Sequence, residues 1–202
     1  MIEIDERDAL VVVDVQNTFC PGGTLPVRDG DAVVAPLNRA MPRFRGRVWA
    51  TQDWHPADHC SFDRHGGPWP PHAVQGTPDA DLHPGLERRH VAHVVRKGST
   101  SDRDAYSGFD GTDLAARLRA GGVTRVFVGG LATDYCVKAT ALDARNAGFG
   151  VVVLTDACRA VDVAPGDGSR AFEEMRSAGC RLATTDEIGA AAPDGVEERA
   201  AS

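Results

Sequence analysis

Three residues whose types suit hydrolytic chemistry each stand at or just after the end of a short apolar run. Asp14 closes LVVVD, Lys97 closes VVRK, and Cys136 lies in GGLATDYC. A carboxylate at the carboxyl end of a buried strand points into the crevice where open α/β sheets bind ligands. Partial burial there would raise its pKa toward that of a useful proton acceptor. The residue types are those of a cysteine nucleophile with a base and a cation.

Cys136 is one of five cysteines, and the chain has no C-x-x-C pair. This argues against a zinc ribbon or a thioredoxin-like site, and any single cysteine can be an inert buried side chain. Thr133 or Asp134 as helix N-cap would place Cys136 in the first turn of a helix. The helix amides would then lower the thiol pKa and hold an oxyanion.

Lys97 is open to a simpler interpretation, because a lysine at a strand end is normally solvated. Its functional interpretation depends on topology. If the first and fourth strands are neighbours, Asp14 and Cys136 face each other across the crevice. A cation ending the third strand could then stabilise both the carboxylate and a thiolate.

A second constellation follows the next apolar run, in TQDWHP. Asp53 and His55 alternate on an extended backbone, so both side chains face one side. His59 and His72 come later in the same loop. One aspartate and three histidines suit one divalent transition metal, with Zn²⁺ as the first expectation and Fe²⁺ or Mn²⁺ as alternatives. Surface histidines are the competing interpretation.

The elements that must position these residues alternate between strand and helix patterns. Continuous apolar runs such as Leu10–Val13 are typical of strands buried on both faces of a parallel sheet. Such alternation predicts a doubly wound α/β domain with right-handed crossovers. The expected strands are Ala9–Val15, Arg47–Thr51, Val91–Val95, Arg125–Gly129, Val151–Leu154 and Arg181–Thr184, and the expected helices are Asp31–Phe44, Thr112–Ala120, Asp134–Ala147 and Gly168–Ala178.

We expect one domain over residues 1–188, with a long loop at 53–110 that is rich in Gly, Pro, His and Trp, and a disordered tail over 189–202. The net charge of −7 argues against a nucleic-acid surface, and no apolar run is long enough to span a membrane. The N-terminus MIEIDERDAL lacks the apolar core of a signal peptide. A cytoplasmic location is therefore expected, and the sequence leaves a homo-oligomer open.

Several motifs in order resemble the isochorismatase-like cysteine hydrolases, and among them the nicotinamidases. They are VVDVQNTFCPGG, TQDWHP with DHCSF, WPPHAVQGTPDADLHP, RKG, AYSGF, and GGLATDYCVKATALDA with VVLTDACRAV, which together cover roughly residues 7–187. The resemblance implies a three-layer fold with a six-stranded parallel sheet of order 3-2-1-4-5-6. It also implies a metal-dependent amidase that converts nicotinamide to nicotinate and ammonia, with pyrazinamide as a further substrate.

The resemblance also implies roles for individual residues. Asp14 would be the base and later the acid, Lys97 its electrostatic partner and Cys136 the nucleophile. A cis peptide before Ala132 would let the amides of Ala132 and Cys136 form an oxyanion hole. The implied metal ligands are Asp53, His55 and His72, with His59 in the set or directly behind it, and the substrate would meet Phe19, Trp69, Tyr106 and Tyr135.

Two departures from the family pattern leave the substrate range open. Thr18 stands where an aspartate is frequent, and Tyr135 stands where some relatives carry a histidine. The alternatives are an amidase for another small amide, such as a ureido acid, and a silent binding protein of the same fold. A vinyl-ether hydrolase of the isochorismatase type is a third, against which the cysteine at position 136 speaks.

Overall fold

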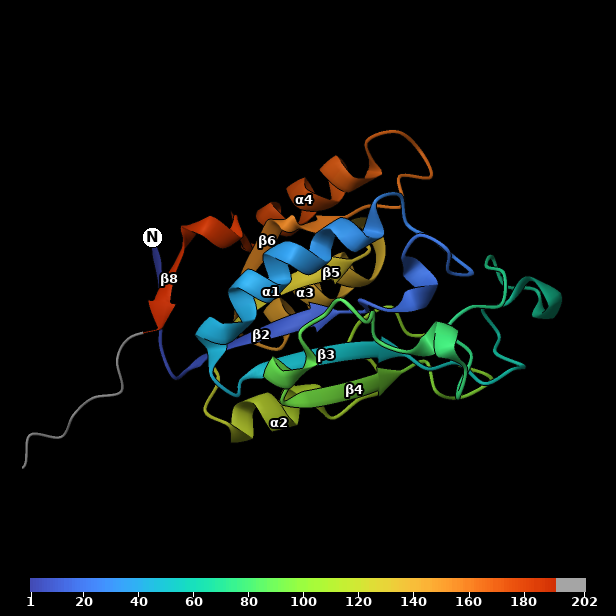
Figure 1. The fold of residues 1–202 in the computed structure, drawn as a ribbon, viewed down its shortest axis with the longest axis horizontal. Coiled ribbons are helices and arrows are strands. Elements are labelled where there is room, and N and C mark those ends of the chain that lie inside the picture. Colours follow the sequence, from blue (N-terminus) through green and yellow to red (C-terminus); the bar gives the residue numbers. More distant parts are fainter. Residues whose placement is uncertain (192–202) are drawn as a thin grey trace, which may run out of the picture.

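The computed structural model describes residues 1–191 and shows a sheet covered by helices on both faces (Figure 1). Its helices are α1 (Val34–Ala40), α2 (Leu114–Ala120), α3 (Lys138–Asn146) and α4 (Asp167–Ser177). Its strands are β1 (Ile2–Ile4), β2 (Asp8–Val13), β3 (Val48–Asp53), β4 (His93–Lys97), β5 (Arg125–Leu131), β6 (Gly150–Arg159), β7 (Arg181–Ala183) and β8 (Ile188–Ala191).

Six of these strands form one parallel sheet in the order β4-β3-β2-β5-β6-β7. Numbered among themselves along the chain, they have the order 3-2-1-4-5-6, which confirms the expected fold. The chain order reverses between β2 and β5, and this switch point is where open α/β sheets place their ligands. Asp14 directly follows β2, and the segment that carries Cys136 follows β5.

Strand β2 shows why the apolar runs are continuous. All six of its residues are buried, because helices cover both faces of the sheet. Leu10 and Val12 belong to the same apolar cluster as Leu37 of α1. Successive side chains point to opposite faces, and Val11 and Val13 accordingly belong to a second cluster, which contains residues of α2, α3 and α4.

A small two-stranded sheet at the end of the molecule was not expected from the sequence. Strand β1 pairs in parallel with β8, with Ile2 opposite Ile188 and Ile4 opposite Ala191. Ile2 and Ile188 are buried in the main apolar cluster, which stabilises the pairing. The prediction of a disordered tail from Gly189 is therefore wrong for residues 189–191, and its remaining part, 192–202, lies outside the described residues.

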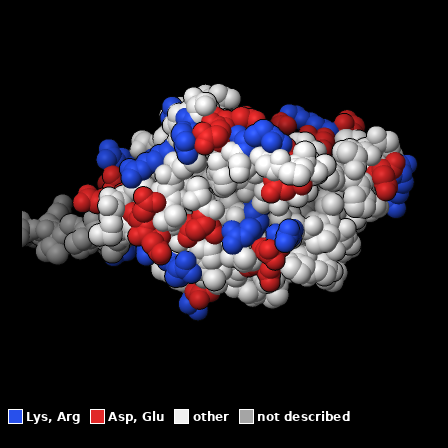
Figure 2. Space-filling view, turned by 90° about the horizontal axis from the view of Figure 1, so that it is seen from above, with Lys and Arg blue, Asp and Glu red and all other residues white. Residues whose placement is uncertain are grey.

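The loops that carry the metal-site candidates gather at one end of the sheet. Residues 54–92 connect β3 to β4 through short 3₁₀ turns. Figure 1 shows the first part of this connection beyond the ends of these strands, opposite β1 and β8, and its last part back at the start of β4, where the Ala92 amide donates to the Val48 carbonyl oxygen. Basic and acidic residues are interspersed over the face seen in Figure 2. Within residues 1–191, no helix combines the length and apolar character that crossing a bilayer requires.

Candidate active site

The ends of β2, β4 and β5 bring Asp14, Lys97 and Cys136 together. Lys97 ends β4, and its side chain is buried at 1% exposure. Its Nζ lies 3.0 Å from Asp14 Oδ2 and 3.5 Å from Cys136 Sγ. The ammonium also donates to the carbonyl oxygen of Ala105, at 3.0 Å. A buried cation thus lies between the candidate base and the candidate nucleophile, as the topological interpretation expected.

Asp14 is held in a defined orientation by its neighbour Thr51 on β3. The Thr51 hydroxyl donates to Asp14 Oδ1 at 2.7 Å and accepts from the Asp14 amide at 3.2 Å. Within residues 1–191, the other oxygen, Oδ2, has the Lys97 ammonium as its polar neighbour and no further hydrogen bond. Burial raises the pKa of the Asp14 carboxyl, although Lys97 opposes the shift. The carboxylate therefore gains basicity without losing its counter-charge.

The local structure around Cys136 differs from the prediction. Thr133–Val137 form a π-helical turn ahead of α3, without a side-chain cap. Asp134, expected as a cap, instead accepts hydrogen bonds from the amides of Val161 and Asp162, both at 2.9 Å. Its carboxylate thus supplies hydrogen-bond acceptors for two amides of the loop after β6, which lie outside any strand. The turn is thus tied to a distant segment that local sequence signals cannot reveal.

The expected lowering of the Cys136 pKa is also wrong. Burial raises the pKa of the thiol well above its ordinary value, and Lys97 reverses only part of that effect. Burial thus favours the neutral thiol over the thiolate. A nucleophilic role then requires a base within reach, and the Lys97 ammonium holds the Asp14 carboxylate next to the sulfur.

Asp53, His55 and His72 form a second buried group, with ligand atoms within 4.8 Å of one another. His55 Nδ1 lies 2.8 Å from the Gly98 carbonyl oxygen, and His72 Nδ1 lies 2.8 Å from the Pro70 carbonyl oxygen. Each ring can thus donate from Nδ1 to a carbonyl oxygen and keep its Nε2 lone pair for a ligand. Burial also lowers the pKa of His72, which favours the neutral, ligating form. The donor set fits a divalent metal.

Asp53 links this group to the catalytic candidates. Its Oδ1 accepts from Lys97 Nζ at 2.5 Å, while Oδ2 lies 3.5 Å from His55 Nε2. Burial by itself would raise the pKa of Asp53, but Lys97 and His55 outweigh it and the pKa is lowered. The carboxylate is therefore ionised and available as a metal ligand while it also pairs with Lys97.

His59 lies outside the group of Asp53, His55 and His72. Its ring stacks on His55 with centroids 4.0 Å apart, and its Nδ1 and Nε2 lie 2.7 Å from Ser61 Oγ and 3.1 Å from the Arg103 carbonyl oxygen. Both nitrogens thus have hydrogen-bond partners. Its ligand atoms come within 4.8 Å of those of His55 and Asp104 instead.

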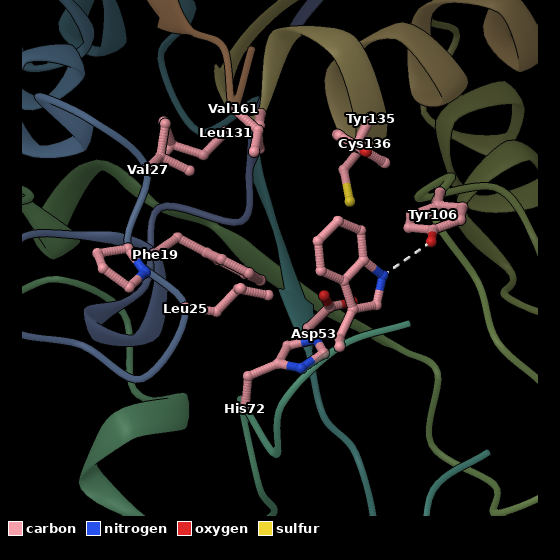
Figure 3. A pocket seen from close by; sticks show the side chains of 13 residues that line it. Phe19, Leu25, Val27, Asp53, His72, Tyr106, Leu131, Tyr135, Cys136 and Val161 are labelled. Atoms are coloured by element: carbon pink, nitrogen blue, oxygen red, sulfur yellow. Dashed lines mark hydrogen bonds between the residues drawn. The ribbon is translucent and has the colours of Figure 1, made fainter. Parts of the chain in front are cut away.

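A pocket opens between the two groups, and Figure 3 shows the Cys136 sulfur pointing into it. The four residues expected to meet a substrate line this pocket: Phe19, Trp69, Tyr106 and Tyr135. Trp69 Nε1 donates to the Tyr106 hydroxyl at 3.0 Å, and the Trp69 ring meets Tyr135 edge-on at 5.2 Å. Trp69, Tyr106 and Tyr135 thus form one continuous wall. Phe19 lies across the pocket beside Leu25, and Asp53 and His72 lie below in the view of Figure 3.

Comparison with known proteins identifies the family of this chain. The model of the isochorismatase domain matches residues 8–187. The chain belongs to the isochorismatase family. An Escherichia coli nicotinamidase is 42% identical over 200 residues, which cover 87% of this chain and 94% of that protein.

Two solved structures are also similar to this chain. A Pyrococcus horikoshii pyrazinamidase in complex with zinc has a TM-score of 0.83 and 46% identity, over 88% of this chain and 99% of that one. An L. infantum protein in complex with nicotinate has a TM-score of 0.89 and 42% identity, over 94% of this chain and 98% of that one. The fold of this chain therefore matches that of one protein that binds zinc and of another that binds nicotinate.

Several residues of this isochorismatase-family site were missed in the sequence. The opposite pocket wall is apolar and is built by Leu25, Pro26, Val27, Leu131 and Val161. Leu25 and Val27 follow two glycines in a loop without periodicity, and Val161 comes from a segment far along the chain. Thr51 lies within a predicted strand, where a threonine is an ordinary strand residue. Its alignment with Asp14 emerges only when β2 and β3 are paired.

Proposed function

We propose that this chain hydrolyses nicotinamide to nicotinate and ammonia, and pyrazinamide in the same way, through a thioester on Cys136. The observation that carries the proposal is the pairing of two buried groups in one pocket. Lys97 lies between Asp14 and Cys136, and Asp53 joins that set to His55 and His72. The likeness to a nicotinamidase and to a nicotinate-bound structure supports this substrate.

The first half of the reaction uses Asp14 as the base. Asp14 Oδ2 accepts the thiol proton, and the Cys136 sulfur attacks the carboxamide carbon. As the proton moves, the negative charge passes from the carboxylate to the sulfur, and the Lys97 ammonium stabilises it at both places. The amides of Ala132 and Cys136 are proposed to receive the oxyanion of the tetrahedral intermediate. The Leu131–Ala132 peptide is cis, as the family resemblance implied.

The second half returns the proton and releases the acid. Protonated Asp14 donates to the leaving nitrogen, so ammonia departs and a thioester remains on Cys136. A water molecule then gives a proton to Asp14 while its oxygen attacks the thioester carbon. Collapse of this intermediate releases the product as the free acid together with the thiolate, which regains its proton from Asp14; the acid then gives its proton to the released ammonia and becomes nicotinate. Each step needs only one proton acceptor next to the sulfur.

We propose Asp53 Oδ2, His55 Nε2 and His72 Nε2 as the ligands of one divalent transition metal. Zinc is the first candidate because a related pyrazinamidase binds it, with iron or manganese as alternatives. When bound, the metal would hold the pyridine nitrogen and thereby orient the ring. His59 is proposed to support His55 by stacking. Phe19, Trp69, Tyr106 and Tyr135 would pack against the ring and exclude water.

The test is ammonia release from a panel of amides by the purified protein. Nicotinamide and pyrazinamide should be hydrolysed, whereas a ureido acid should not. Preferred hydrolysis of the ureido acid would assign the chain to the related amidases instead. Release from none of the amides, by folded protein supplied with zinc, would favour a binding protein of the same fold. The cytoplasmic location and a homo-oligomeric state stay predictions.

A further inference from the structure

Gln16 takes part in none of the steps above, yet its side chain is completely buried beside both groups. The regular pairing of β2 with β3 ends at Val12 opposite Ala50. The backbone then turns at Asp14, whose φ of 47° is unusual for a residue with a side chain. Beyond that turn, β3 continues to Asp53 without a strand on this side.

The Gln16 amide replaces the missing strand. Its Oε1 accepts from the Asp53 amide at 2.8 Å, and its Nε2 donates to the Asp53 carbonyl oxygen at 2.9 Å. The same Nε2 donates to the Ala80 carbonyl oxygen at 2.8 Å. Both backbone polar groups of Asp53 that face β2 are thus paired with one side chain, as a neighbouring strand would pair them.

The opposite side of Asp53 is held by the sheet. Asp53 pairs with Lys97 in the β3–β4 register, so its backbone is fixed from both sides. Its carboxylate oxygens serve two neighbours, with Oδ1 on Lys97 and Oδ2 facing His55. A small rotation of the Asp53 backbone would therefore displace a candidate metal ligand and the counter-charge of Lys97 together.

We infer that Gln16 is a positioning residue that sets the place of the Asp53 carboxylate for the divalent metal and for Lys97. The metal part of this inference rests on the proposed function. Only an amide meets the requirement, because the position needs one acceptor toward an N–H and one donor group toward two carbonyl oxygens. A glutamate would turn an oxygen toward those carbonyl oxygens, and an apolar side chain would leave the Asp53 backbone groups unpaired.

Gln52 is a matched control, because it is also buried, at 5% exposure, and lies next to Asp53 in β3. Its Nε2 donates to the same Ala80 carbonyl oxygen at 2.7 Å. Its Oε1 accepts from Arg96 at 3.3 Å, away from the Asp53 backbone. Replacing either glutamine by methionine removes a buried amide of the same size. Only the change at position 16 leaves the backbone N–H and C=O of Asp53 without their hydrogen-bond partner.

The experiment compares Gln16→Met, Gln16→Glu and Gln52→Met with the unaltered protein. The zinc dissociation constant is measured on the metal-free proteins by competition with a chromophoric chelator, and kcat/KM for nicotinamide is measured at saturating zinc. Thermal unfolding of each metal-free variant reports the structural cost. Loss of a hydrogen bond that orients a metal ligand weakens metal binding by about 10- to 100-fold. We expect that loss in both Gln16 variants, with at least about a tenfold fall in kcat/KM, and neither effect in Gln52→Met.

The outcomes separate this inference from the proposed function. If Gln16→Met binds zinc within about twofold of the unaltered protein, the inference is overturned while the proposed function stands. If Gln52→Met weakened zinc binding equally, the inference would also be overturned, because the loss would then come from a general destabilisation of this region and not from Asp53. An unaltered protein that hydrolyses nicotinamide while it binds none of zinc, iron and manganese would refute both the metal site and the role given to Gln16. If Gln16→Met does not fold, Gln16→Glu decides by the same measurements.

Discussion

Replacing Lys97 by methionine tests the centre of the proposed site. Methionine keeps the length and apolar character of the stem but removes the charge that Asp14, Asp53 and Cys136 share, at 3.0, 2.5 and 3.5 Å. Removing one partner of a buried ion pair costs about 3–5 kcal/mol, because it leaves an uncompensated buried charge. The free energy of unfolding should fall by about that amount, which a domain with about 5–15 kcal/mol of stability can survive.

The effect on catalysis follows from the same contacts. Without the cation, two buried carboxylates lie side by side, and one of them takes up a proton. If Asp14 is protonated, the thiol has no base, and general base catalysis is worth about 10²- to 10⁴-fold. If the transition state loses about 3–5 kcal/mol of stabilisation, the rate falls by about 10²- to 10⁴-fold as well, at about 1.36 kcal/mol for each factor of ten. We therefore expect kcat/KM for nicotinamide to fall by about 10²- to 10⁴-fold.

The assay is ammonia release by Lys97→Met, with Lys138→Met as the control. Lys138 also forms an ion pair, with Glu174 at 3.0 Å, but at the surface, where such pairs contribute about 1 kcal/mol or less. Circular dichroism and thermal unfolding establish that each variant is folded. A folded Lys97→Met that retains kcat/KM within about threefold of the unaltered protein would show that the buried cation is not needed for the reaction.

Three further outcomes are expected. Cys136→Ala should lose at least about 10³-fold in ammonia release while it still binds nicotinate, since it removes the covalent nucleophile and keeps the pocket; near-normal release would exclude Cys136 as the nucleophile. His72→Ala should weaken zinc binding by about 10-fold or more and raise KM, as measured by metal content and steady-state kinetics; unchanged metal content would remove His72 from the ligand set. Nicotinamide should exceed benzamide in kcat/KM by about 10⁴-fold at equal metal loading, because benzamide lacks the ring nitrogen; equal values would mean that the metal does not hold the ring.

The fold was predictable because its signals are local and repeated. Continuous apolar runs such as Leu10–Val13 are typical of strands covered on both faces, and their alternation with helices restricts the topology to few choices. The pair β1 and β8 escaped prediction because each strand is short and gains its stability from a partner almost the whole chain away. Only the apolar pattern of Ile2 and Ile4 could have suggested it.

The candidate site was predictable where function depends on residue type and position at a strand end. Asp14, Asp53 and Lys97 all follow or end a strand of one sheet, so the parallel topology alone brings them together. The state of Cys136 was not predictable, because its pKa depends on burial by distant segments. The positions of Val161 and His59 depend on how long loops pack, and no periodic signal in the sequence specifies that.

The pairing of β1 with β8 has a consequence for how the chain can be rearranged. Because the strands are parallel, Ala191 lies beside Ile4, and Ile2 is only two residues, or about 7 Å, back along the strand direction. A linker of a few residues could therefore join residue 191 to residue 2, at the end of the molecule opposite the loops that follow β3 (Figure 1). New termini could then be opened at Gly46, where an added side chain would meet open space. The order of elements along the chain would change, but the sheet that brings Asp14, Lys97 and Cys136 together would stay intact.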